Sequence, residues 1–162
     1  MKKERARKIG LNATTEKWGP SIGIKQPPPN RTHEIMKLLS HIIQQSKSSI
    51  SIPGPFITLL AEENGTFSNH ADAAEIAVDL CELSGGTDVA VISLVTNNSM
   101  KIYPIDLEMI KLYRMFQEPL IERVVTTRIP TDKGLFRCTG YREKYSNREH
   151  LLFQSYTPDK KD

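Results

Sequence analysis

The sequence predicts an α/β protein of the α+β kind, in which helices flank a mixed sheet and a short β-rich segment follows. Amphipathic helical patterns and a near-continuous apolar run lie between residues 30 and 95, and the pattern becomes β-prone from Arg123 onward. The chain has 162 residues, of which 38% are hydrophobic. A chain of this length can bury a core, so we expect most of it to fold.

Residues 1–26 are predicted to form a basic tail and linker. This segment opens with several Lys and Arg residues, has no sustained hydrophobic period, and runs into the proline-rich residues 26–29. No RNA-binding aromatic motif or helix-turn-helix spacing accompanies the charges. We therefore expect a solvated tail and no nucleic-acid partner.

Two helices carry clear start signals. Apolar residues recur at helical spacing between residues 35 and 43, and Asn30 or Thr32 is available as the N-cap. Asp72 and Glu75 have the spacing of a capping box at the head of a second helix, which ends before Gly85 and Gly86. Both segments are predicted to be helical.

The remaining elements are predicted mainly from apolar runs. They are a short strand after the turn at residues 53–55, a strand at 89–95 buried on both faces, a helix at 105–116, and strands near 124–125, 135–141 and 151–156. The change from helical to β-rich patterning gives a predicted domain boundary between residues 123 and 124.

The cysteine spacing gives no sign of a zinc-binding or redox protein, and the hydropathy gives no sign of a membrane-spanning one. Cys81 and Cys138 have no CxxC spacing, and no apolar run approaches the roughly 20 residues of a membrane span. We expect no membrane partner and a cytoplasmic location, or a plastid one if the chain is part of a longer plant form.

The most specific motif is residues 75–92, which resembles the stretch GHTEAAVDLxxLAGxxPVAVLCE of the 3,4-dihydroxy-2-butanone 4-phosphate synthases, found in riboflavin biosynthesis. Upstream, Gly23 with Ile24 and Asn30 with Arg31 resemble the TTGIS and ADRA stretches of that family. The segment that begins at Pro53 resembles its PGHIFPLRA stretch. The common order of these segments indicates a resemblance to the bifunctional riboflavin protein.

The resemblance continues toward the C-terminus. Residues 113–123 are similar to the AYRxxxExLVER stretch, and residues 129–150 are similar to the opening of GTP cyclohydrolase II. The resemblance therefore implies an incomplete synthase-like domain at 27–123, with a mixed sheet and flanking helices. It also implies the opening β segment of a cyclohydrolase II-like domain at 124–162.

The resemblance implies a chemistry for which key residues are replaced. The synthase acts on ribulose 5-phosphate with magnesium, but Ala73 stands at the position of the GHTE histidine, and Leu94 stands at the glutamate of LCE. The family's acidic loop has no counterpart before Gly23, and the three zinc-binding cysteines of the cyclohydrolase have none here. We expect no catalytic residue, no metal ligand set and no cofactor, neither the Mg of the synthase nor the Zn of the cyclohydrolase.

Four residues remain as candidates for phosphate or substrate binding: Arg31, Glu75, His70 and Asp72. Arg31 matches the arginine of the family's ADRA stretch. His70 falls near the position at which the family has an arginine just before GHTE. A shifted loop would let His70 and Asp72 replace the lost ligand. Glu75 also has a structural role as the capping partner of Asp72.

Three functional hypotheses follow. The first is a catalytically inactive fragment or pseudoenzyme of the riboflavin pathway, and the second is an active synthase working through a rearranged or inter-subunit site. The third is an unrelated α/β interaction module. Because an incomplete domain leaves apolar surface uncovered, we expect a homodimer or a hetero-oligomer with a complete homologue.

Overall fold

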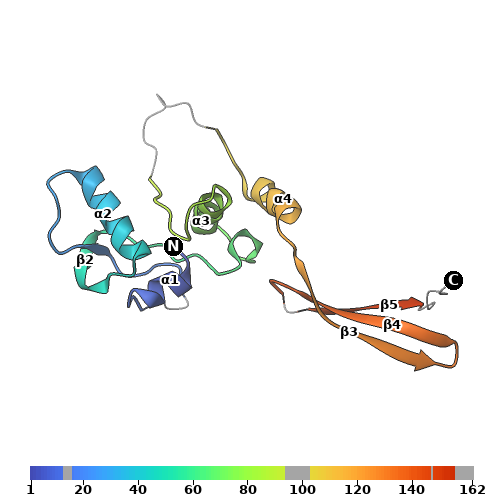
Figure 1. Cartoon of the computed structure of the whole chain (residues 1–162). Coiled ribbons are helices and arrows are strands. Elements are labelled where there is room, and N and C mark those ends of the chain that lie inside the picture. The colour runs from blue at the N-terminus through green and yellow to red at the C-terminus, as the bar shows by residue number, and fades with distance from the viewer. Residues whose placement is uncertain (13–15, 94–102, 147, 156–162) are drawn as a thin grey trace. The chain divides into compact units, whose positions relative to one another are not determined.

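A computed structural model describes residues 1–12, 16–93, 103–146 and 148–155 (Figure 1). The chain divides into two compact units, Met1–Lys111 and Leu112–Asp162. Helices combine with two antiparallel sheets, which confirms the predicted α/β class. The division falls before the predicted boundary at residue 123, and the assignment of the units to the synthase and the cyclohydrolase stays a prediction.

The first unit is built around a two-stranded sheet and three helices. Strand β1 pairs antiparallel with β2, with Ile24 opposite Ile50. The elements are α1 (Lys3–Lys8), β1 (Ile22–Ile24), α2 (Arg31–Ile43), the 3-10 turn η1 (Lys47–Ser49), β2 (Ile50–Phe56), the 3-10 turn η2 (Gly65–Phe67) and α3 (Ala73–Leu83). The main core joins residues of α1, β1, α2 and β2.

The N-terminal segment is part of this core, so the prediction of a solvated tail is wrong for its described residues. Helix α1 buries Ala6, and Ile9 and Leu11 are buried just after it. These residues pack in the same cluster as Leu38 and Ile42 of α2. The apolar burial outweighs the repulsion among the basic residues because their charged ends reach outward to carboxylates.

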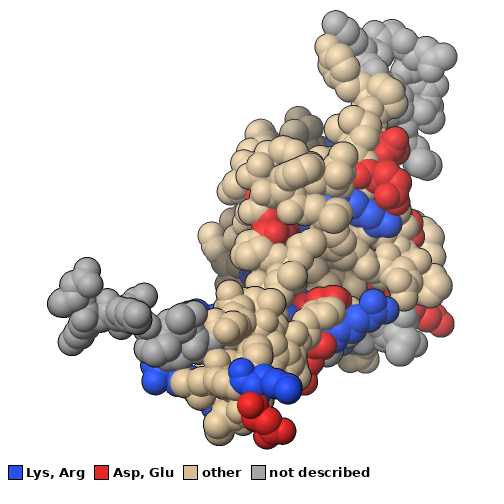
Figure 2. Space-filling view, turned by 90° about the vertical axis from the view of Figure 1, so that its right-hand side faces the viewer, with Lys and Arg blue, Asp and Glu red and all other residues tan. Residues whose placement is uncertain are grey.

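The basic residues of the segment are paired with acidic residues far along the chain. Lys2 binds Glu82 at 2.7 Å, and the guanidinium of Arg5 lies 2.8 Å from Asp88. On the face drawn in Figure 2, blue and red side chains lie next to each other. The N-terminal charge therefore serves in part to attach α1 to the residues that end and follow α3.

Both predicted helix starts are confirmed. The Asn30 side chain accepts hydrogen bonds from the backbone N–H groups of Thr32 and His33, at 2.9 and 3.2 Å. The capping box of Asp72 and Glu75 opens α3. Both helices start where a side chain satisfies the free N–H groups of the first turn.

Two predicted strands are placed differently. Strand β2 contains the segment 53–55 instead of following it, and a Cβ at Gly54 would collide with the backbone of Ile22 and Gly23. Only glycine therefore allows β2 to approach β1 here. Residues 89–93 form no strand, and Val91 and Ile92 are 55% and 44% exposed; Leu94 and the rest of that predicted strand lie outside the described residues.

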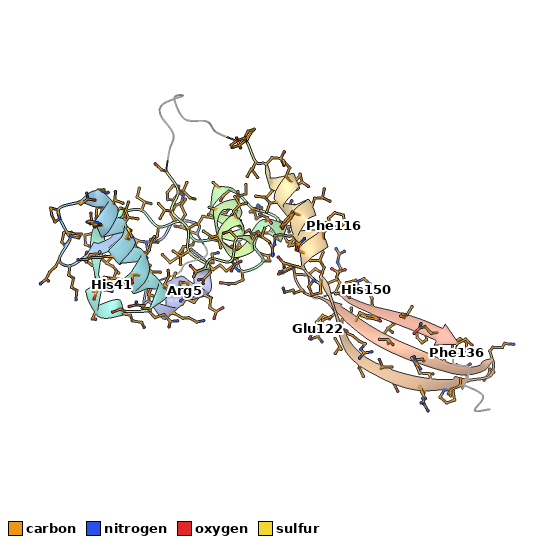
Figure 3. All side chains as sticks on the ribbon, turned by 45° about the horizontal axis from the view of Figure 1, so that its top comes forward. Arg5, His41, Phe116, Glu122, Phe136 and His150 are labelled. Carbon is orange, nitrogen blue, oxygen red and sulfur yellow. The ribbon has the colours of Figure 1, made fainter. Side chains whose placement is uncertain are left out.

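The second unit is a three-stranded antiparallel meander in the order β3-β4-β5. The unit begins within α4 (Leu107–Gln117), a helix that the sequence predicted. Its strands are β3 (Ile121–Thr131), β4 (Gly134–Glu143) and β5 (Glu149–Ser155). Figure 3 shows Phe136 and His150 toward opposite ends of this sheet. The three predicted C-terminal strands are thus confirmed, with β3 longer than expected.

A polar cluster joins the end of α4 to the turn between β4 and β5. The Arg114 guanidinium donates to Glu118 at 2.7 Å, and the Tyr145 hydroxyl donates to the same carboxylate at 2.6 Å. The hydrogen bond from Arg114, with that from Tyr145, lowers the pKa of Glu118 to about 2 although partial burial opposes ionisation. This carboxylate is the shared acceptor that ties the helix to the turn.

We predict that Gly65→Ala destabilises the first unit more than Gly85→Ala. Both glycines have positive φ angles, 57° and 82°, but a Cβ at Gly65 would collide with the carboxylate of Asp79, whereas one at Gly85 would meet nothing within 4 Å. We expect a loss of about 1 kcal/mol at Gly85 from backbone strain and about 2–4 kcal/mol at Gly65. Urea unfolding followed by Trp18 fluorescence measures both, and equal losses would contradict the collision.

We predict that the second unit loses stability as the pH falls from about 4.5 toward about 2. The folded pKa of Glu118 is depressed, so its contribution is complete above the unfolded value and disappears as the carboxylate is protonated. After allowance for solvent screening, the loss is about 1–2 kcal/mol. Urea titrations at several pH values, followed by NMR signals of β4, should show this slope flattened in Glu118→Gln and retained in the control Glu122→Gln.

Candidate functional site

The segment that corresponds to the GHTE stretch forms the first turn of α3. The Asp72 side chain accepts a hydrogen bond from the backbone N–H of Ala74, at 2.9 Å. The Glu75 carboxylate accepts one from the backbone N–H of Asp72, also at 2.9 Å. The two acids therefore cap the helix reciprocally.

The Glu75 carboxylate is fully enclosed and its two oxygens both have partners. One oxygen accepts from the backbone N–H of Glu62 at 3.1 Å. The other accepts from Asp72, and from the Lys17 ammonium at 3.2 Å. A buried carboxylate requires such donors, and this set links the residue 62 loop, the N-terminal segment and α3.

Lys17 is the central residue that sequence reasoning missed. Its ammonium lies 2.7 Å from the Asp72 carboxylate and donates to the carbonyl oxygen of His70. Burial opposes its charge, but the hydrogen bonds to Asp72 and Glu75 outweigh burial and raise its pKa. Burial likewise opposes ionisation of Asp72, yet the bonds from Lys17 and Ala74 lower its pKa.

The structure brings three of the four predicted candidates together. His70, Asp72 and Glu75 all contact Lys17. Arg31 lies on α2, where it pairs with Glu34 at 3.2 Å and stacks over the Phe56 ring at 4.1 Å from its centroid. No hydrogen bond or ion pair within the described ranges joins Arg31 to the other three.

This arrangement does not fit a magnesium ion. Ala73 offers only a methyl group, and both oxygens of Glu75 are occupied by N–H donors and an ammonium. A hard cation needs several accessible oxygen ligands. In the part of the chain that the structure describes, no group of three or more His, Cys, Asp or Glu residues is placed to hold a metal.

The cysteines are separate from this segment. Cys81 lies on α3 and is half-buried, whereas Cys138 is buried in β4. Each is a free thiol, and small buried thiols commonly pack like apolar residues. None of the helices in the described ranges has the length and apolar character needed to cross a bilayer.

Comparison with curated proteins gives relatives in one pathway. The riboflavin biosynthesis protein RibBA of Bacillus cereus (strain AH187) is 32% identical over 114 residues, which cover 61% of this chain and 28% of that protein. RibBA of Bacillus mycoides (strain KBAB4) is 32% identical over 119 residues, 64% of this chain and 30% of that protein. This chain is a partial and divergent relative of the riboflavin biosynthesis proteins.

A plant protein shows the same similarity. The probable monofunctional riboflavin biosynthesis protein RIBA 3, chloroplastic, of Oryza sativa subsp. japonica is 32% identical over 108 residues, 57% of this chain and 20% of that protein. The chain thus spans less than a third of the length of each of these curated relatives. No family model matches the chain.

The fold is shared with a solved structure. RibBX of A. baumannii, a two-domain 3,4-dihydroxy-2-butanone 4-phosphate synthase, superposes with a TM-score of 0.57 at 20% identity, covering 96% of this chain and 54% of that one. This likeness confirms a synthase-like fold. The curated relatives above confirm the predicted relationship to riboflavin biosynthesis proteins.

We predict that Lys17→Met destabilises the first unit by about 1–3 kcal/mol, because the enclosed Glu75 carboxylate loses its only ammonium partner among the described residues. Lys8→Met is the matched control, since Lys8 forms an exposed pair with Glu4 on one helix and should cost less than about 0.5 kcal/mol. Urea unfolding at neutral pH measures both variants. A Lys17 effect no larger than that of Lys8 would contradict the structural role of the pair.

Proposed function

We propose that the chain acts in riboflavin biosynthesis as a non-catalytic protein of the 3,4-dihydroxy-2-butanone 4-phosphate synthase type. The observation that carries this proposal is the state of Glu75, the one GHTE residue that the chain keeps. Its carboxylate is fully enclosed and bonded to two backbone N–H groups and an ammonium. A carboxylate that is enclosed and hydrogen-bonded in this way stabilises the fold and is not accessible to a substrate.

The chemistry of the reaction supports the same conclusion. Rearrangement of ribulose 5-phosphate requires acids and bases within hydrogen-bond reach of the substrate, together with a bound magnesium ion. Here the histidine position carries Ala73, and Asp72 caps a helix and pairs with Lys17. His70 is exposed, and a lone exposed imidazole supplies neither the metal ligands nor the paired acid.

A regulatory or scaffolding partner of a complete synthase is the role that we propose. An apolar cleft of about 460 Å³ in the first unit is lined by residues of α2, β2 and the segment 89–92, and Val91 and Ile92 beside it are exposed. Exposed apolar surface of this kind is typical of protein interfaces. We propose a homodimer or a complex with a complete homologue, in the cytoplasm, where free thiols such as Cys81 and Cys138 persist.

We predict that the purified chain, supplied with magnesium and ribulose 5-phosphate, releases formate no faster than buffer alone. RibBX of A. baumannii, the synthase described above, serves as the active control in the same assay. Asp72→Asn is the matched variant, because it changes the first turn of α3 and should leave the background rate unchanged. Light scattering of the same sample should give a mass above the 18.3 kDa of one chain.

Each readout has its own contrary result. Formate release that follows the chain through repurification and is lost in His70→Ala would establish an active, rearranged site instead. A monomer that resists dilution, and that does not associate with RibBA of Bacillus cereus when the two proteins are mixed, would remove the proposed partner role while leaving the absence of catalysis intact.

A further inference from the structure

A second cleft lies in the first unit, at the end of α2 away from Arg31. It has a volume of about 570 Å³, within the usual range of small-molecule sites. Its walls come from the second half of α2, the end of β1 with the residues that follow it, and η1. The polar residues that the argument uses are Lys25, Lys37, Ser40, His41, Ser48 and Ser49.

Backbone hydrogen bonds fix these three walls relative to one another. The N–H of Lys25 donates to the carbonyl of Ser49 at 3.2 Å, which joins the end of β1 to η1. The N–H of Ser46 donates to the carbonyl of His41 at 2.8 Å, which joins α2 to the turn that leads into η1. The lining side chains therefore start from a defined backbone frame.

All the formally charged side chains that line this cleft are positive. Two ammonium groups, from Lys25 and Lys37, line it together with hydroxyls, an amide and an imidazole, and no carboxylate is among the lining residues. Neither lysine forms an ion pair with any residue that the structure describes. By contrast, Lys2, Lys3 and Lys17 of the same unit are each paired with a carboxylate.

His41 also lines this cleft. Its Nδ1 is enclosed and has no hydrogen-bond partner within the described ranges. An enclosed polar atom without a partner is costly, and either nitrogen of an imidazole can donate a hydrogen bond when it carries the proton. Figure 3 shows His41 on α2.

We propose that this cleft binds the phosphate group of a sugar-sized phosphomonoester. Every polar side chain of its lining can donate a hydrogen bond, and two carry positive charge, which is the set that a tetrahedral dianion requires. The volume exceeds that of a phosphate ion and leaves room for a sugar-sized body. The site is separate from the Asp72–Glu75 segment, so it does not depend on the proposed function.

The test uses the full chain, labelled with ¹⁵N, and titrates it with ribose 5-phosphate, with inorganic phosphate and with ribose. Saturable shifts should appear at the amides of Lys25, Lys37, Ser48 and Ser49 with both phosphates and not with ribose. Lys25→Gln with Lys37→Gln should weaken ribose 5-phosphate binding at least about tenfold, because both fixed charges are lost. Both lysines are exposed, so the variant should melt like the parent chain.

The matched control is the double variant Arg7→Gln with Lys133→Gln, which removes the same charge from exposed basic residues outside the cleft. It should change the affinity by less than about twofold at moderate salt. Equal weakening in both double variants would reduce the effect to net charge. Absence of saturation up to about 10 mM phosphomonoester, or shifts centred on Arg31 or on residues 70–75, would overturn the proposal.

Discussion

The first unit depends on one enclosed carboxylate. Glu75 accepts hydrogen bonds from segments that lie 13 and 58 residues away in the sequence, as well as from the cap of its own helix. Loss of any of these donors would leave the buried Glu75 carboxylate short of a hydrogen-bond partner, which costs folding free energy. The N-terminal segment, the residue 62 loop and α3 are therefore held in one arrangement by a single side chain.

The same constraint explains how a synthase-like fold can persist when Ala73 stands at the GHTE histidine position. A helix can retain its capping glutamate for stability after the neighbouring histidine position has become Ala73. The relatives that are 32% identical to this chain over 114 and 108 aligned residues are consistent with preservation of the frame. In this chain the frame needs the Glu75 carboxylate enclosed and hydrogen-bonded, whereas catalysis would need it accessible.

Local signals predicted the fold where the determining contacts are local. The caps at Asn30 and Asp72 act within three residues, so their patterns are readable in the sequence. Lys17 meets its acidic partners across more than fifty residues, which leaves no local signature. The spacing of Ala6 and Ile9 did carry a helical signal, but the basic composition of that segment concealed it, and residues 89–93 show that an apolar run alone does not form a strand.

The second unit presents the opposite case, because several apolar side chains on one side of its sheet are exposed in the part of the chain that the structure describes. The strand register divides the side chains of this sheet between two faces. One face carries Val125, Cys138, Leu151 and Phe153. The other face carries Arg128, Arg137 and Gln154. Val125, Leu151 and Phe153 are more than half exposed. A three-stranded sheet gains its stability from burying such a face. A covering layer would bury these side chains, which agrees with the homodimer or the complex with a complete homologue that we propose.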